Sequence, residues 1–249
     1  MEIKGSVAVV TGGSGGLGRV ISRKLAEAGA NVAVVYQREE GVAREVCGEL
    51  TELGVEAMAV QADVSSETDV LRMAQTVRDH FGRIDILVND AAYNIAISYA
   101  DMAGATTDIW DKIMGVNLKG PFLCMRTIGP MMKEQGNGRI VNIASIAGLI
   151  PTGSSIPYAV SKAGLIHLTR CMAVGLAPEV LVNAAAPGFM EGTRASANLS
   201  SEYLERARAR SLSGNVISKE EVADQVLLFI RSDALTGQTL CMEGGGCFH

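Results

Sequence analysis

The chain has 249 residues, 48% of them hydrophobic, which predicts a single folded domain over residues 1–249. A formal net charge of -5 and a pI of about 5.3 argue against nucleic acid as a partner. No apolar run reaches the roughly 18 residues of a membrane span, and the first residues, MEIKG, lack the pattern of a secretory signal. The five cysteines form no CxxC pair and the histidines are isolated, so we expect reduced thiols, a cytoplasmic location, no membrane partner and no metal site.

Strand-like apolar runs alternate with helical patterns along the whole chain. Strands are expected at 6–11, 31–36, 55–63, 84–89, 139–145, 180–186 and near 238–242. Helices are expected at 17–28, 40–53 and 66–81, the last capped by Ser66 with Asp69. Most of the strands are continuously apolar, which is typical of a parallel sheet covered on both faces. The sequence therefore predicts an α/β fold with a single doubly wound, Rossmann-type sheet of about seven strands.

The first expected strand runs into a glycine-rich turn, TGGSGGLG at 11–18, which opens the first helix. Glycines let the backbone approach a ligand closely, and the free N–H groups of a helix N-terminus attract a pyrophosphate. A purely structural turn is the alternative, but the position between strand and helix is the one a nucleotide-binding turn requires. The residues expected to bind a cofactor here are Gly12, Ser14, Gly15, Gly16, Leu17 and Gly18.

Tyr158 and Lys162 are four residues apart in an expected helix and therefore share one face of it. A free tyrosine has a pKa of about 10, so bringing it near 7 needs on the order of 4 kcal/mol. One ammonium at about 4 Å, with an effective dielectric constant of 20, supplies roughly that much. The pair is thus either an acid–base device or an aromatic ring packed on a lysine stem, and a strand ending in Ser145 just before it favours the first.

Taken together, the motifs resemble the classical short-chain dehydrogenase/reductase (SDR) family, and in layout the 3-oxoacyl-carrier-protein reductases and related carbonyl reductases. The motifs, in family order, are TGxxxGxG at Gly12, Gly16 and Gly18, then Asp63-Val64, Asn89, Asn117, Ser145, Tyr158-x-x-x-Lys162 and Pro187-Gly188. The resemblance covers essentially the whole chain. It departs from the family at Asp90 and Ala92, where Asn-Asp-Ala-Ala replaces the usual Asn-Asn-Ala-Gly, and at Gly192, where the family often has threonine or serine.

The resemblance implies a catalytic set of Asn117, Ser145, Tyr158 and Lys162. Tyr158 would exchange a proton with the substrate oxygen, Ser145 would hydrogen-bond that oxygen, and Lys162 would lower the tyrosine pKa and hold the nicotinamide ribose. Asn117 would position a water that links the lysine to solvent. Further cofactor contacts would come from Asp63, Val64, Asn89, Ala91, Pro187, Gly188 and Met190.

The end of the second strand bears on the choice between NAD and NADP. NAD-binding sheets usually carry an acidic residue there, whereas this chain has Tyr36 and Gln37, followed by Arg38. A guanidinium suits the 2′-phosphate of NADP, so NADP is the predicted cofactor. The alternative is that Arg38 is a solvated surface charge, and Gly15, at the other position where the family often has a basic residue, weakens the NADP prediction.

The predicted function is an NADP(H)-dependent oxidoreductase acting on a small-molecule carbonyl or secondary alcohol. The alternatives are an NAD-dependent dehydrogenase of a hydroxysteroid, sugar or other secondary alcohol and, from another class, a non-catalytic nucleotide sensor. Residues 189–217 are expected to cover the substrate. The resemblance implies a homotetramer with the tail, LCMEGGGCFH, at a subunit interface.

Overall fold

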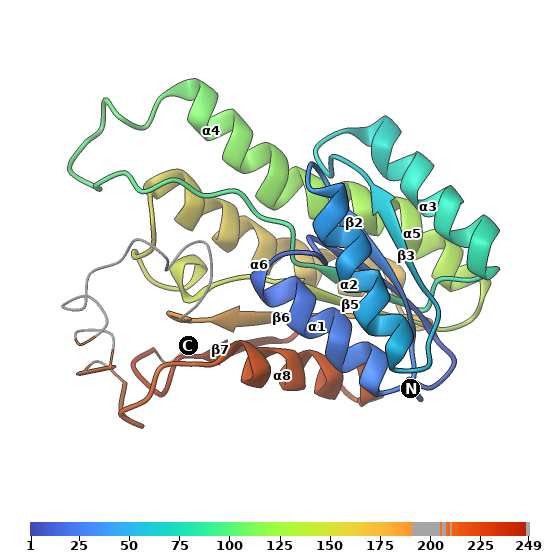
Figure 1. Cartoon of the computed structure of the whole chain (residues 1–249). Helices are drawn as coiled ribbons and strands as arrows, with labels where there is room; N and C mark the ends of the chain where they lie inside the picture. Colours follow the sequence, from blue (N-terminus) through green and yellow to red (C-terminus); the bar gives the residue numbers. More distant parts are fainter. Residues whose placement is uncertain (191–204, 206–207, 210, 248–249) are drawn as a thin grey trace.

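The computed structural model describes residues 1–190, 205, 208–209 and 211–247 (Figure 1). The strands are β1 (Val7–Thr11), β2 (Asn31–Tyr36), β3 (Ala57–Gln61), β4 (Ile86–Asn89), β5 (Gly138–Ile143), β6 (Val180–Pro187) and β7 (Thr239–Met242). The α-helices are α1 (Gly16–Glu27), α2 (Glu40–Glu52), α3 (Glu67–Phe81), α4 (Thr107–Met114), α5 (Gly120–Glu134), α6 (Ile156–Leu176) and α8 (Lys219–Arg231). A π-helical turn, η1 (Gly115–Lys119), joins α4 to α5, and a 3-10 turn, η2 (Ile146–Gly148), follows β5.

The strands form one parallel sheet in the order β3-β2-β1-β4-β5-β6-β7. The chain moves outward in one direction from β1 to β3, returns to pair β4 with β1, and then moves outward in the other direction. The doubly wound fold with its seven strands is therefore confirmed. A sheet of this kind binds ligands at the carboxyl edge beside the point where the order reverses, between β1 and β4.

Within the part of the chain that the structure describes, three helices cover each face of the sheet, and successive residues of a strand pack against opposite faces. On one face, Ala8 and Val10 of β1 pack in a cluster with α1, α2 and α8. On the other, Val7 and Val9 pack with α3, α5 and α6. The inner strands β1, β2, β4, β5 and β6 are buried on both sides, which explains why they read as continuous apolar runs, whereas the edge strands β3 and β7 are only partly buried. Figure 1 shows α8 lying alongside α1, so the last helix of the chain packs against the first.

Most expected element boundaries agree with the structure to within a few residues, and Ser66 caps α3 as predicted, accepting a hydrogen bond from Asp69 N. The expectation that Ser145 ends the fifth strand is wrong, because β5 ends at Ile143. Ser145 is instead the N-cap of η2 and accepts a hydrogen bond from Ala147 N at 3.2 Å. The third strand is also shorter than expected, so Asp63 lies two residues beyond its last residue, Gln61.

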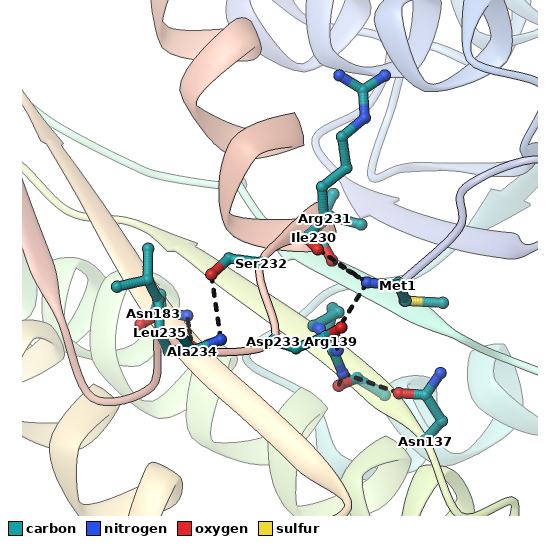
Figure 2. A network of polar contacts seen from close by, with 11 residues as sticks. Met1, Asn137, Arg139, Asn183, Ile230, Arg231, Ser232, Asp233, Ala234 and Leu235 are labelled. Carbon is teal, nitrogen blue, oxygen red and sulfur yellow. Dashed lines mark hydrogen bonds and ion pairs between the residues drawn. The ribbon is translucent and has the colours of Figure 1, made fainter.

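A network of polar contacts lies at the amino edge of the sheet, opposite the ligand-binding edge (Figure 2). Arg139, near the start of β5, is 5% exposed and forms an ion pair with Asp233, which follows α8. The Met1 ammonium contacts the same carboxylate at 3.2 Å and Arg231 O at 3.0 Å. The burial of the guanidinium and its several partners indicate that this network fixes the end of α8 against the sheet.

Candidate functional site

A large cavity of about 2030 Å³ opens at the carboxyl edge of the sheet. Its walls come from the segments that follow β1, β2, β3, β4, β5, β6 and β7, together with α6. The predicted site residues that line it are Gly12, Ser14, Gly15, Gly16, Leu17, Arg38, Asp63, Val64, Ala91, Ser145, Tyr158, Lys162, Pro187, Gly188 and Met190. Gly18, Asn89 and Asn117 do not line it. The volume exceeds that of a typical small-ligand pocket, about 300–1,000 Å³, and leaves room for a dinucleotide beside a substrate.

The glycine turn has the tight backbone that a phosphate cradle needs. Gly12 has a φ of 70°, and a Cβ placed on Gly18 would lie 2.2 Å from Gly12 O. Gly18 therefore serves the closeness of the turn and does not face the cavity. The N-cap residue of α1 is Gly15, which has no side chain to cap the helix, and the first turn contains no acidic residue of its own. The residues present thus fit a pyrophosphate at this helix end.

Ser145, Tyr158 and Lys162 converge at the floor of the cavity. Tyr158 and Lys162 lie in the first two turns of α6, which begins after the buried N-cap Ser155. The hydroxyl of Ser145 hydrogen-bonds the Tyr158 phenol. Lys162 is buried, its Nζ donates to Ile143 O at 2.7 Å, and it lies 5.8 Å from the centre of the Tyr158 ring. The lysine is therefore held by the end of β5 and not by the tyrosine.

The electrostatics of this group differ from the sequence-based expectation. Burial raises the pKa of Tyr158; the hydrogen bond from Ser145 lowers it, and the nearby Asp90 carboxylate raises it further. Burial lowers the pKa of Lys162 to about 8, and Asp90 counteracts this shift. The Lys162 ammonium itself donates to Ile143 O. Because its pKa is raised, the phenol is protonated at neutral pH in the structure.

Asn117 lies in η1 and is fully buried. Its Oδ1 accepts a hydrogen bond from Tyr93 N at 2.8 Å, and its Nδ2 donates to Tyr93 O at 2.9 Å and to Ser161 Oγ at 3.2 Å. The side chain therefore ties the loop after β4 to helix α6. The π-helical turn supplies the extra residue that points Asn117 inward, a frequent feature of functional helices.

Arg38 and Asp63 lie on the wall where the adenosine end of a dinucleotide would lie. Arg38 is exposed, and its charge lowers the pKa of the Asp63 carboxyl. Burial raises that pKa, but hydrogen bonds from Ser65 and Gln37 outweigh burial, so the net shift is downward. Gln37 Nε2 donates to Asp63 Oδ2 at 2.8 Å, which fixes the carboxylate at the cavity rim.

Many lining residues were missed by the sequence analysis, among them two near the end of the chain, and the predicted cofactor contact Asn89 does not reach the cavity. Glu243 and Gly246 follow β7 and reach the cavity from the far end of the chain. Their only sequence signal is the position of a glycine-rich segment just after the last strand. Asn89 points into the protein instead and donates to Asn142 Oδ1 at 2.8 Å. Most of the predicted substrate-covering segment, 189–217, lies outside the described residues, including Gly192.

Comparison with known proteins agrees with this geometry. The model of the family described as short chain dehydrogenase matches residues 6–204. The chain belongs to the short-chain dehydrogenase family. The resemblance noted from the motifs is therefore confirmed, and with it an NAD(P)-dependent oxidoreductase. No helix among the described residues is long and apolar enough to cross a membrane.

Similar proteins carry several activities in their names. A Streptomyces violaceoruber protein named as ketoacyl reductase 2 of the granaticin polyketide synthase is 38% identical over 96% of this chain and 95% of its own. The 3-oxoacyl-[acyl-carrier-protein] reductase of Staphylococcus epidermidis is 36% identical over 96% of this chain and 97% of its own length. Among solved structures, NAD+-bound xylitol dehydrogenase superposes with a TM-score of 0.90 at 28% identity, covering 98% of this chain and all (100%) of that one. NADPH-dependent 3-quinuclidinone reductase from Rhodotorula rubra superposes with a TM-score of 0.88, also at 28% identity. The superposition covers 99% of this chain and 92% of that one.

Proposed function

We propose that this short-chain dehydrogenase is an NADP(H)-dependent reductase of a carbonyl compound, working reversibly on the corresponding secondary alcohol. The observation that carries the proposal is the convergence of Ser145, Tyr158 and Lys162 in one cavity with the glycine turn. A bound nicotinamide supplies or accepts the hydride. The tight Gly12–Gly18 backbone and the glycine N-cap of α1 support pyrophosphate binding at one end of the cavity, and Lys162 supports ribose binding at the other.

The proton chemistry follows from the protein side chains. In reduction, Tyr158 donates its phenolic proton to the carbonyl oxygen as negative charge develops there. The Ser145 hydroxyl donates a second hydrogen bond to that oxygen. Because the pKa of Tyr158 is raised, the phenol carries its proton at neutral pH, which suits the reductive direction. Lys162 keeps a positive charge near the site and gains a proton more readily when Asp90 is ionised.

The cofactor preference rests on Arg38. Its exposed guanidinium lines the cavity beside Asp63 and is free to approach a 2′-phosphate there. The NAD+-bound xylitol dehydrogenase and the NADPH-dependent quinuclidinone reductase resemble the chain equally well, so they favour neither cofactor. NAD-dependent oxidation of a secondary alcohol such as a sugar is the second candidate, supported by the likeness to xylitol dehydrogenase.

The relatives named as ketoacyl reductases support a 3-oxoacyl substrate. A carrier protein is acidic as a rule and docks best on a basic surface, whereas this chain itself carries a formal net charge of -5. We therefore favour a free small molecule or a thioester over a carrier-bound chain. The cytoplasmic location and the homotetramer stay predictions.

Parallel fluorescence titration with NADPH and NADH, followed by a panel of ketones and 3-oxoacyl thioesters, tests the proposal. Tighter NADPH binding with turnover supports it, and tighter NADH binding refutes the role of Arg38. Cofactor binding without turnover on any substrate favours the nucleotide sensor.

Tyr158→Phe is the decisive variant for the mechanism. It should lower kcat by about 10²–10⁴ while cofactor affinity stays within severalfold of wild type. The matched control is Tyr99→Phe, which removes a phenol that donates to Thr152 O at 2.5 Å and does not contact Ser145. Equal rates in wild type and Tyr158→Phe would overturn the proposed acid–base role.

A further inference from the structure

Asp90 is a carboxyl group at the centre of the candidate site to which the proposed chemistry gives no role. It follows β4 at the point where the strand order reverses and lines the cavity. Its backbone N–H donates to Thr11 Oγ1 at 3.1 Å, as does that of Ala91, so the main chain is fixed against the end of β1. This anchoring directs the side chain toward the glycine turn.

The carboxylate occupies the helix end that a pyrophosphate needs. It accepts a hydrogen bond from Gly18 N, in the first turn of α1, and its Oδ2 lies 2.9 Å from where a Cβ on Gly18 would be. It thereby supplies the negative charge that the first turn of α1 lacks. A cofactor diphosphate carries its own negative charge to the same N–H groups. The two anions are consequently brought close together when a cofactor binds.

The groups around Asp90 leave its charge only partly compensated. The side chains that act on it among the described residues are Lys162 and Tyr158, both from α6, while β1 contributes the neutral Thr11. Arg19, the residue after Gly18, is held away by its ion pairs with Glu45 and Glu49 on α2. Burial raises the pKa of Asp90 to about 7, against lowering by Lys162 and by the Gly18 hydrogen bond. The carboxyl is thus poised to change its protonation state near neutral pH.

We propose that Asp90 takes up a proton when a dinucleotide binds, so that cofactor affinity is coupled to pH through this carboxyl group. This inference rests on the proposed function, because it requires a dinucleotide at the glycine turn. On binding, one solvent proton forms an O–H bond with the Asp90 carboxylate; on release, the proton returns to solvent. The neutral acid still accepts the N–H of Gly18 and no longer repels the diphosphate.

The sign follows from linkage. The pKa of Asp90 is lower in the free protein than in the complex with the cofactor. Cofactor binding is therefore tightest below pH 7 and weakens as the pH rises through about 7. With the complex remaining protonated, Kd should rise about fourfold between pH 5.5 and 7.5. At pH 7.5 binding should take up about three quarters of a proton.

NADH is the probe of choice for the pH series, because the 2′-phosphate of NADPH itself titrates at about pH 6. Fluorescence titration at pH 5.5, 6.5 and 7.5 gives Kd. Calorimetry at pH 7.5, in buffers of different ionisation enthalpy, counts the protons without any variant. Asp90→Asn keeps an acceptor for Gly18 N and removes this titration, so the fourfold rise of Kd should be lost. Asp90→Asn combined with Lys162→Met, which removes the second titrating group as well, should give a Kd that is flat over this range.

Two further variants separate Asp90 from other titrating groups. Asp85→Asn changes another buried carboxyl, just before the amino end of β4 and away from the glycine turn, and should keep the wild-type pH dependence. Lys162→Met removes the other titrating group. The Kd of this variant for NADH should still depend on pH, but the change should move to higher pH, because Asp90 loses its cationic neighbour.

A pH-independent Kd in wild type with no proton uptake would overturn the inference while leaving the proposed function standing. Retention of the full pH dependence in Asp90→Asn would also overturn it. If wild type binds neither NADH nor NADPH at any of these pH values, the proposed function fails as well.

Discussion

Replacing Asn117 with aspartate tests whether this residue holds the site together through its hydrogen bonds. The change keeps the side-chain shape and the acceptor for Tyr93 N but turns the Nδ2 donor into an oxygen. That oxygen would face Tyr93 O at 2.9 Å and Ser161 Oγ at 3.2 Å. The Ser161 hydroxyl already donates to Tyr158 O at 2.7 Å, so it cannot readily supply the missing proton.

These contacts set the loss in the free energy of unfolding. Two lost hydrogen bonds contribute about 1 kcal/mol each, and a buried acceptor facing acceptors adds about 1–3 kcal/mol. The expected destabilisation is therefore about 3 kcal/mol or more, which for a chain of this size lowers Tm by about 6–12 °C. A protonated acid could donate to Tyr93 O again. The folded-state pKa of the new aspartate should thus be raised, so the loss is small at low pH and grows as the pH rises through that value.

Thermal unfolding at pH 5.5 and pH 8, each compared with wild type at the same pH, measures both effects. Asn117→Ala serves as the control, because it loses both Nδ2 contacts, and the contact with Tyr93 N as well, without introducing a titratable group. Its difference from wild type should not depend on pH. A Tm within 2 °C of wild type for Asn117→Asp at pH 8 would refute the structural role assigned to the amide.

Three other substitutions have outcomes set by the same structure. Gly148→Ala should lower kcat at least tenfold with the fold retained, because its Cβ would lie 2.6 Å from the Lys162 carbonyl carbon and push η2 away from α6; steady-state kinetics and circular dichroism measure this. Gly48→Ala, with nothing within 4 Å of the new Cβ in α2, should stabilise the protein by about 0.5–1 kcal/mol, and an unchanged or lower Tm would contradict this. Arg139→Ala should lower the free energy of unfolding by about 2 kcal/mol, because a buried guanidinium and its ion pair are lost. The Kd for NADPH should stay unchanged, because the contacts of Arg139 with Asp233 lie at the amino edge of the sheet, away from the cavity.

The fold could be predicted from the sequence because its determinants are local or periodic. Continuous apolar strands, the glycine turn and the cap at Ser66 each depend on residues a few positions apart, and the structure has all three. The spacing of Tyr158 and Lys162 likewise requires only one helix, α6.

Features that depend on distant partners could not be predicted in the same way. The amide of Asn117 finds its partners 24 residues earlier, at Tyr93, and 44 residues later, at Ser161, and no pattern within VNLKG indicates either. The ammonium of Lys162 donates to Ile143 O, a backbone atom with no sequence signature, so this contact could not be predicted either. Asp90 was recognised as a departure from its family, but its influence on α6 became evident only from the folded structure.

The cavity draws its walls from residues between Gly12 and Gly246, nearly the full span of the chain. During synthesis on the ribosome, a nascent chain that has made β6 but not β7 presents the backbone of Ala184–Pro187 as an open sheet edge. Such a chain also lacks Glu243 and Gly246 from the cavity wall, and α8 reaches α1 only late in translation. A cofactor can therefore stabilise the completed polypeptide but offers little help to one interrupted before Thr239, which would be prone to aggregation and proteolysis.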